Sequence, residues 1–178
     1  MQMILVALSC LLVLVLTIAG GRSGRELGIR GNGFVASLWS WPVAGLGMAM
    51  VLIMGLLAGT LHPLDPGTPR WHALIYLAWA LEQQFLLQSF FFVRLERVTR
   101  QPALAAALLF SSVHIPNLAL VLATAFAGWF FCECFRRWRN LYPLAVAHAG
   151  LGLALASAVP DSWLHHMRVG ISYLKYFH

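Results

Sequence analysis

The polar residues of one long apolar segment are the first candidates for chemistry. Within the run 73–93, four strongly polar side chains fall inside seven residues: Glu82, Gln83, Gln84 and Gln88. On a regular helix Gln84 and Gln88 share one face, whereas Glu82 lies about 160° from Gln84. A carboxylate held beside a histidine is suited to act as a general base. The alternative is structural, because glutamines of neighbouring membrane helices also hydrogen-bond to one another.

Two histidines interrupt later apolar segments. His114 ends the run 103–114, and His148 lies inside the run 142–159. Each alone could be a packing residue. Ionisable side chains in such runs are costly, however, and Glu82, His114 and His148 come from three separate runs. We therefore expect these three residues to share one polar cavity.

Two further motifs have simpler interpretations. Asn117 is expected to be a turn residue or the N-cap of the helix that follows it, while its closeness to His114 leaves a functional role open. Cys132 and Cys134 are not expected to bind a metal, because no other cysteine or histidine in the same loop completes a tetrahedral set. With Cys10 the cysteines are odd in number, so we expect packing residues and no disulfide framework.

Composition sets the class of protein. Of the 178 residues, 60% are hydrophobic and 10% are charged, whereas a soluble domain has about 45–50% apolar and about 25% charged residues. The formal net charge of +6 comes from arginines in short gaps between apolar runs. The chain is therefore expected to be an integral membrane protein, with the lipid bilayer and not nucleic acid as its partner. A soluble DNA-binding protein, a Rossmann enzyme and a disulfide-rich secreted domain are excluded.

The apolar runs predict an all-α, polytopic transmembrane bundle of about six membrane helices. The runs are residues 3–19, 35–59, 73–93, 103–114, 118–134 and 142–159. The fourth run is too short to cross a bilayer easily, and Pro116 follows it. We expect the fourth and fifth runs to form a hairpin that is broken at His114–Asn117 inside the bilayer. Irregular backbone at that depth must be buried in protein or line a wet cavity.

Basic residues predict the orientation. The first, third and fifth gaps between the runs hold three arginines each, and the other gaps and the tail hold only Arg70, Arg168 and Lys175. The arginine-rich gaps should face the cytoplasm of a bacterial inner membrane, which puts both termini outside it. Tryptophans near the ends of the runs suit the membrane interfaces; they are Trp39, Trp41, Trp71, Trp138 and Trp163. We expect one domain over residues 1–178, with a core at 70–159 and two additional N-terminal helices with their loops at 1–69.

The order of these polar residues resembles the CPBP family of intramembrane proteases, also called the Abi or CAAX-protease family. That family has Glu-Glu-x-x-x-Arg on one helix, Phe-x-x-x-His on the next and His-x-x-x-Asn/Asp on a later helix. The segment Phe110-Ser111-Ser112-Val113-His114 matches the second motif, and His148 begins the third. The resemblance covers roughly residues 70–159.

The first and third motifs depart from the family pattern. Gln83, Gln84 and Gln88 stand where the family has two glutamates and an arginine. Glu82, the nearest carboxylate, is one residue early. Gly152 stands at the Asn/Asp position. Because an amide cannot accept a proton, these changes decide whether the protein cuts peptides or only binds them.

The resemblance implies an intramembrane endopeptidase, of glutamic or metal-dependent type, that acts on a membrane-associated protein or peptide. It assigns catalytic roles to Glu82, His114 and His148. Substrate-binding or oxyanion roles fall to Gln83, Gln84, Gln88 and Asn117. No cofactor is predicted; zinc is the alternative, because two histidines and one carboxylate match the ligand number of a catalytic zinc. The rival functions are an inactive membrane scaffold and a small transporter, the latter disfavoured because no inverted repeat is present.

Overall fold

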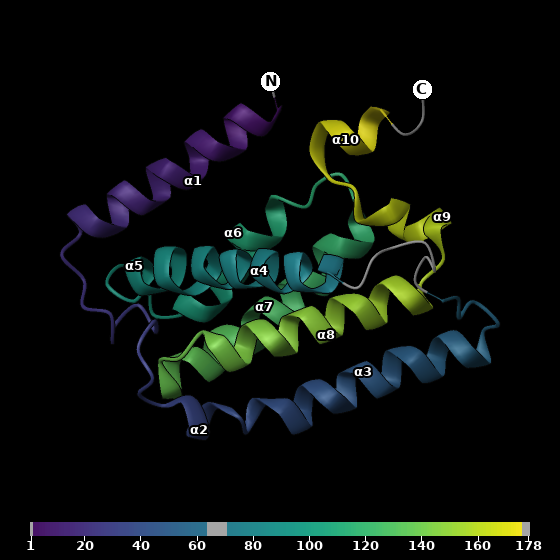
Figure 1. The fold of residues 1–178 in the computed structure, drawn as a ribbon, viewed down its shortest axis with the longest axis horizontal. Coiled ribbons are helices and arrows are strands. Elements are labelled where there is room, and N and C mark those ends of the chain that lie inside the picture. The colour runs from purple at the N-terminus through teal and green to yellow at the C-terminus, as the bar shows by residue number, and fades with distance from the viewer. Residues whose placement is uncertain (1, 64–70, 176–178) are drawn as a thin grey trace.

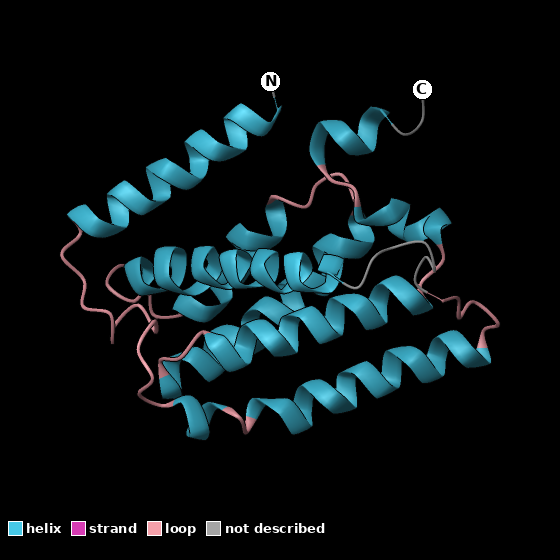
Figure 2. Ribbon diagram, viewed as in Figure 1, coloured by secondary structure: helices cyan, strands magenta, loops and turns pink. Residues whose placement is uncertain are grey.

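The computed structural model describes residues 2–63 and 71–175, and in this part of the chain it contains helices and loops but no strand (Figure 2). The all-α class is thus confirmed there. The helices are α1 (Gln2–Ala19), α2 (Phe34–Ser37), α3 (Ser40–Leu57), α4 (Trp71–Gln84), the π-helix η1 (Phe85–Phe92), α5 (Val93–Leu95), α6 (Pro102–Ser112), α7 (Leu118–Trp138), α8 (Tyr142–Ala158), α9 (Asp161–Leu164), the 3-10 helix η2 (His165–Met167) and α10 (Gly170–Leu174). Arg70 and most of the proline-rich loop 62–69 lie outside the described residues.

Each of the six predicted apolar runs is helical over most of its length. Two stretches, Phe34–Leu57 and Leu118–Trp138, are long and apolar enough to cross a membrane, and Pro102–Ser112 and Tyr142–Ala158 are shorter apolar helices. In Figure 1, α1 lies apart from the layered helices α3, α8 and α4. The count of six spans and the outside location of both termini stay predictions.

The third run is one continuous rod made of α4, η1 and α5. Its middle part, η1, is a π-helix of eight residues. Such i→i+5 turns are rare and occur frequently at functional sites. Gln84 caps η1 and Gln88 lies inside it, so the wider turn changes the angle between these two side chains from that of a regular helix.

Helices α3 and α8 pack side by side and run in the same direction. Trp41 Nε1, near the start of α3, donates to the carbonyl of Pro143 near the start of α8. Gly55, near the end of α3, lies against Ala158 at the end of α8. Small residues allow this close approach of two backbones, as in other membrane helix pairs.

Replacing Gly55 by alanine is expected to destabilise this pair by about 1–3 kcal/mol. An added Cβ would lie 2.7 Å from Ala158 Cβ and 2.9 Å from its Cα, and neither atom can move aside without moving α8. Thermal unfolding in detergent should show a lower Tm for Gly55→Ala. Gly45→Ala is the matched control, because nothing lies within 4 Å of a Cβ at that position. An equal Tm for the two variants would contradict the packing described.

The break between the fourth and fifth runs is present as predicted. Helix α6 has 11 residues, about 16 Å at 1.5 Å per residue and about half of a hydrocarbon core. It lies against α7, where Gly128 brings the backbone close to Ala107. The chain reverses through residues 113–117, with the Asn117 amide bonded to the carbonyl of His114. The depth of this turn in the bilayer stays a prediction.

Hydrogen bonds hold the connector 20–33 against the turn between α7 and α8. Asn140, fully buried, donates from Nδ2 to the carbonyls of Arg30 (2.9 Å) and Asn32 (3.1 Å). The amide of Leu141 bonds to the carbonyl of Gly28. The polar, glycine-rich stretch is therefore held in place by hydrogen bonds to its backbone carbonyls.

The buried core lies between η1, α6, α7 and the start of α8. Phe92, Phe131 and Phe135 are its largest aromatic members. Cys132 and Cys134 are buried in the same cluster as free thiols. Their predicted role as packing residues is confirmed.

Candidate functional site

The centre of the candidate site is the imidazole of His148 on α8. Its Nδ1 lies 3.0 Å from Nε2 of Gln84, the last residue of α4. The ring of Phe131 from α7 stacks on it, with centroids 5.8 Å apart and planes 19° apart. Contacts from two other helices thus fix the orientation of the imidazole.

Gln88 extends this cluster by one turn. Its Nε2 donates to the carbonyl of Phe131 at 3.0 Å. Gln84 and Gln88 both have 0% exposure. Within the described residues, the Oε1 atoms of both amides are buried without a hydrogen-bond partner. Two acceptors with unmet hydrogen bonds therefore lie beside His148, and an unpaired buried acceptor is costly unless a donor reaches it.

His114 approaches the same site from the end of α6. Its Nδ1 lies 3.1 Å from the carbonyl oxygen of Phe110, which can only accept, so Nδ1 carries the proton and Nε2 of the neutral ring is an acceptor. The Phe110 ring meets the imidazole edge-on at 5.2 Å. His114 is 8% exposed and close enough to His148 for the two rings to interact electrostatically. The shared site of His114 and His148 stays a prediction, which this interaction supports.

Glu82 does not join them. It lies on an exposed part of α4, and the described partners of the His148 ring are Gln84 and Phe131. The physical reason is helical geometry, because Glu82 is far around the helix from Gln84, which faces α8. Gln83 is half-buried. Of the polar residues in this run, Gln84 and Gln88 are therefore the ones buried around His148.

Asn117 is the N-cap of α7, as the sequence predicts. Its Oδ1 accepts from the amide of Leu120 at 3.2 Å. Its Nδ2 donates to the carbonyls of Leu164 (2.7 Å) and Arg168 (3.1 Å). Both amide hydrogens have partners inside the protein, so the oxyanion role assigned to this residue finds no free donor in this conformation.

Tyr76 on α4 lies beside the site, although nothing in the sequence singles it out. A Cβ added to Gly152 would overlap the Tyr76 hydroxyl. Gly152 lies one helical turn after His148 and on the same face of α8. Tyr76 thus occupies the space where a larger residue would project, and its hydroxyl makes no hydrogen bond within the described residues. The only signal in the sequence was the glycine itself, which does not say what fills its space.

The residues of the site do not fit the zinc alternative. A catalytic zinc needs three protein ligands such as histidine and carboxylate. In the described part of the chain, no group of three histidine, cysteine, aspartate or glutamate residues is placed to hold a metal ion. Glutamine amides beside two histidines do not complete such a set.

Comparison with protein families gives one match. The model of the family described as type II CAAX prenyl endopeptidase Rce1-like matches residues 66–154. This chain belongs to the Rce1-like family. No curated protein and no solved structure matches the chain.

The matched region of this Rce1-like protein carries the whole cluster. It includes α4, η1, α6, α7 and most of α8, and with them Tyr76, Gln84, Gln88, His114 and His148. Members of the family are intramembrane proteases. The family match and the two apolar, membrane-length helices together support a membrane protein with a protease-type core.

Proposed function

We propose that this protein is a membrane-embedded endopeptidase that cleaves a peptide bond of a membrane-associated protein, with His148 as the general base. The observation that carries the proposal is the 3.0 Å contact between Gln84 and Nδ1 of His148. In the structure the amide presents Nε2, which can only donate, so Nδ1 accepts and the proton of the neutral imidazole lies on Nε2. In the active form that we propose, the amide is turned by about 180°, so its unpartnered Oε1 accepts from Nδ1–H and Nε2 of the imidazole is free to accept a proton. The Cys-His-Asn proteases orient their histidine with an amide in the same way.

The chemistry balances with the two histidines and water. Nε2 of His148 takes a proton from water while the water oxygen attacks the scissile carbonyl carbon. His148 then gives that proton to the amide nitrogen as the C–N bond breaks. Nε2 of His114 accepts a hydrogen bond from the other O–H of the water and so orients the water molecule. This proposal assigns the base to His148 instead of Glu82, which is exposed.

An oxyanion needs a donor that is not already in use. Nε2 of Gln88 donates to the carbonyl of Phe131, and the Gln84 amide is used to orient His148. The Tyr76 hydroxyl makes no hydrogen bond within the described residues, and it lies against Gly152, one helical turn after His148. We therefore assign the oxyanion contact to Tyr76, with half-buried Gln83 as the next donor on α4.

Tyr76→Phe is expected to lower kcat by about 10²–10³-fold, the usual effect of removing one oxyanion donor. KM should change little, because the hydroxyl acts on charge that develops only in the transition state. Steady-state cleavage in vesicles measures both constants. Tyr142→Phe is the control: it removes a hydroxyl that bonds to the carbonyl of Ile29 in the connector 20–33 and not to Gln84, His148 or Gly152. Equal kcat values for Tyr76→Phe and the wild type would remove Tyr76 from the mechanism.

A non-catalytic membrane binding protein is the second candidate function. The favouring observation is the pair of buried Oε1 atoms on Gln84 and Gln88, which could accept backbone N–H groups of a bound peptide. An amide also stabilises a protonated histidine less than a carboxylate does. The same residues would then bind a peptide without cutting it.

Cleavage of membrane-anchored peptides separates the two functions. Purified protein in vesicles would be incubated with peptides that carry a prenylated or acylated C-terminal segment, and the products identified by mass spectrometry. The proposal expects cleavage of at least one peptide by the wild type. Binding of a peptide without any product, even after long incubation, would favour the binding protein.

A further inference from the structure

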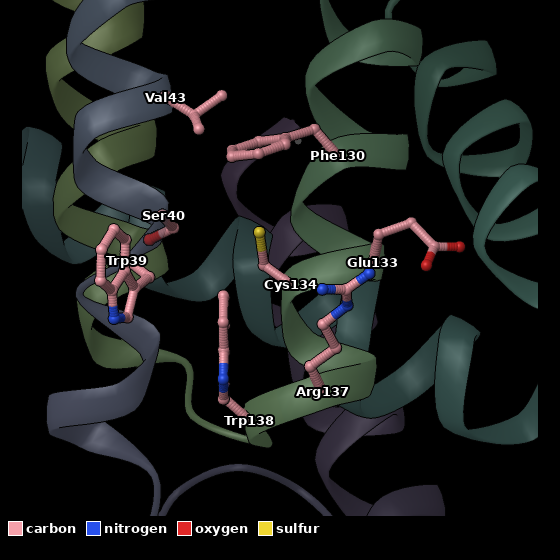
Figure 3. Close-up of a pocket in the computed structure, with 8 residues that line it drawn as sticks. All are labelled: Trp39, Ser40, Val43, Phe130, Glu133, Cys134, Arg137 and Trp138. Atoms are coloured by element: carbon pink, nitrogen blue, oxygen red, sulfur yellow. The ribbon is translucent and has the colours of Figure 1, made fainter.

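We propose that the pocket between α3 and α7 binds the phosphate-bearing headgroup region of an anionic phospholipid, with Arg137 as its anchor. The cavity has a volume of about 250 Å³ (Figure 3). Its lining residues come from the start of α3 and the end of α7: Trp39, Ser40, Val43, Phe130, Glu133, Cys134, Arg137 and Trp138. None of them belongs to the cluster around His148.

The charge of Arg137 lacks a carboxylate partner. Its neighbour Arg136 is paired with Glu133 at 2.6 Å, and Arg139 is paired with Glu96. Of these three arginines, only Arg137 makes no ion pair within the described residues, and it is exposed. Glu133 also lines the pocket, but Arg136 neutralises it, and its carboxylate points away from the two tryptophans in Figure 3. The net charge of the pocket is therefore positive.

The other walls suit a lipid better than a soluble anion. Val43 and Phe130 form an apolar end, and Trp39 and Trp138 lie near the end that holds Arg137 (Figure 3). Tryptophans prefer the level of lipid headgroups. Both α3 and α7 belong to the stretches long enough to cross a membrane. An acyl chain can thus lie against the apolar end while Arg137 bonds to the phosphate, as basic pockets between membrane helices do.

Native mass spectrometry of the detergent-released protein tests this site. The protein would be titrated with phosphatidylglycerol or with phosphatidylcholine, and the bound fraction measured at each concentration. Arg137→Gln should weaken phosphatidylglycerol binding by about fivefold or more. Arg136→Gln is the matched control, since that neighbouring exposed arginine is already paired with Glu133. Trp39→Ala should also weaken binding, because it removes one wall of the pocket.

Four results would overturn the proposal. Unchanged binding by Arg137→Gln would exclude the anchor, and equal losses for Arg136→Gln and Arg137→Gln would indicate only diffuse surface charge. Equal affinity for the two lipids would exclude selection of an anionic headgroup. Displacement of the lipid by millimolar inorganic phosphate would indicate a site for a soluble anion. The measurement involves no cleavage, so its outcome is independent of the proposed protease activity.

Discussion

His148→Ala is expected to lower the cleavage rate by about 10²–10⁴-fold, the usual contribution of a positioned general base. The structure gives this imidazole a fixed orientation between Gln84 and Phe131, and both contacts disappear with the ring. Product formation from a saturating membrane-anchored peptide measures the loss. His62→Ala is a control, because the ring of that histidine bonds to the nearby Thr60 carbonyl in its own loop and the residue lies outside the family match.

Glu82→Gln gives the sharpest comparison with His148→Ala. Glu82 is exposed and is not a described partner of the His148 ring, so the variant should retain cleavage within about threefold of the wild type, well short of the loss of a general base. A loss as large as that of His148→Ala would return the base to Glu82 and contradict the mechanism proposed above.

Gln84→Glu is expected to increase cleavage by tenfold to about 10⁴-fold. The change places a carboxylate at the position 3.0 Å from Nδ1 of His148, where it stabilises the imidazolium that forms during the reaction. The upper limit of this gain is taken from the reverse change: replacing the aspartate of a Ser-His-Asp protease by asparagine lowers kcat by about 10⁴-fold. If the wild type only binds peptides, the same variant should create a cleavage activity that was absent.

The matched control for that experiment is Gln83→Glu. It makes the same chemical change one residue earlier, on a half-buried side chain that does not contact His148. We expect no gain from it. A gain in both variants would indicate a general effect of negative charge on substrate binding, and no gain in either would argue against His148 as the base.

The sequence predicted those parts of the site that depend on local chemistry. Pro116 and the short fourth run predicted the break after α6, and Asn117 predicted its own role as the N-cap. The cost of burying histidines in apolar runs also predicts that His114 and His148 share one site, and this stays a prediction. These inferences need only spacing along the chain and the energetics of burial.

The features of the site that the sequence did not predict depend on the type of helix turn and on which side chains face a neighbouring helix. A regular helix was assumed from residue 73 to 93, whereas the chain changes to a π-helix at Phe85. No residue in Phe85–Phe92 signals that change. Which of Glu82 and Gln84 faces α8 is set by packing, so the exposure of Glu82 could not be foreseen. Tyr76 and Gly152 are 76 positions apart, and only their contact in space identifies the hydroxyl.

The hydrogen bonds that hold the connector 20–33 cannot form until residues near Asn140 have been synthesised. The carbonyl of Arg30 is 110 positions from Asn140, the side chain that holds it. A ribosome adding about 5–20 residues per second needs on the order of 5–20 s to cover that distance. Gly55 likewise lacks its packing neighbour on α8 until Ala158 has been made. The first third of the chain is therefore synthesised well before these contacts can form, and they form only when the last long helix has been made.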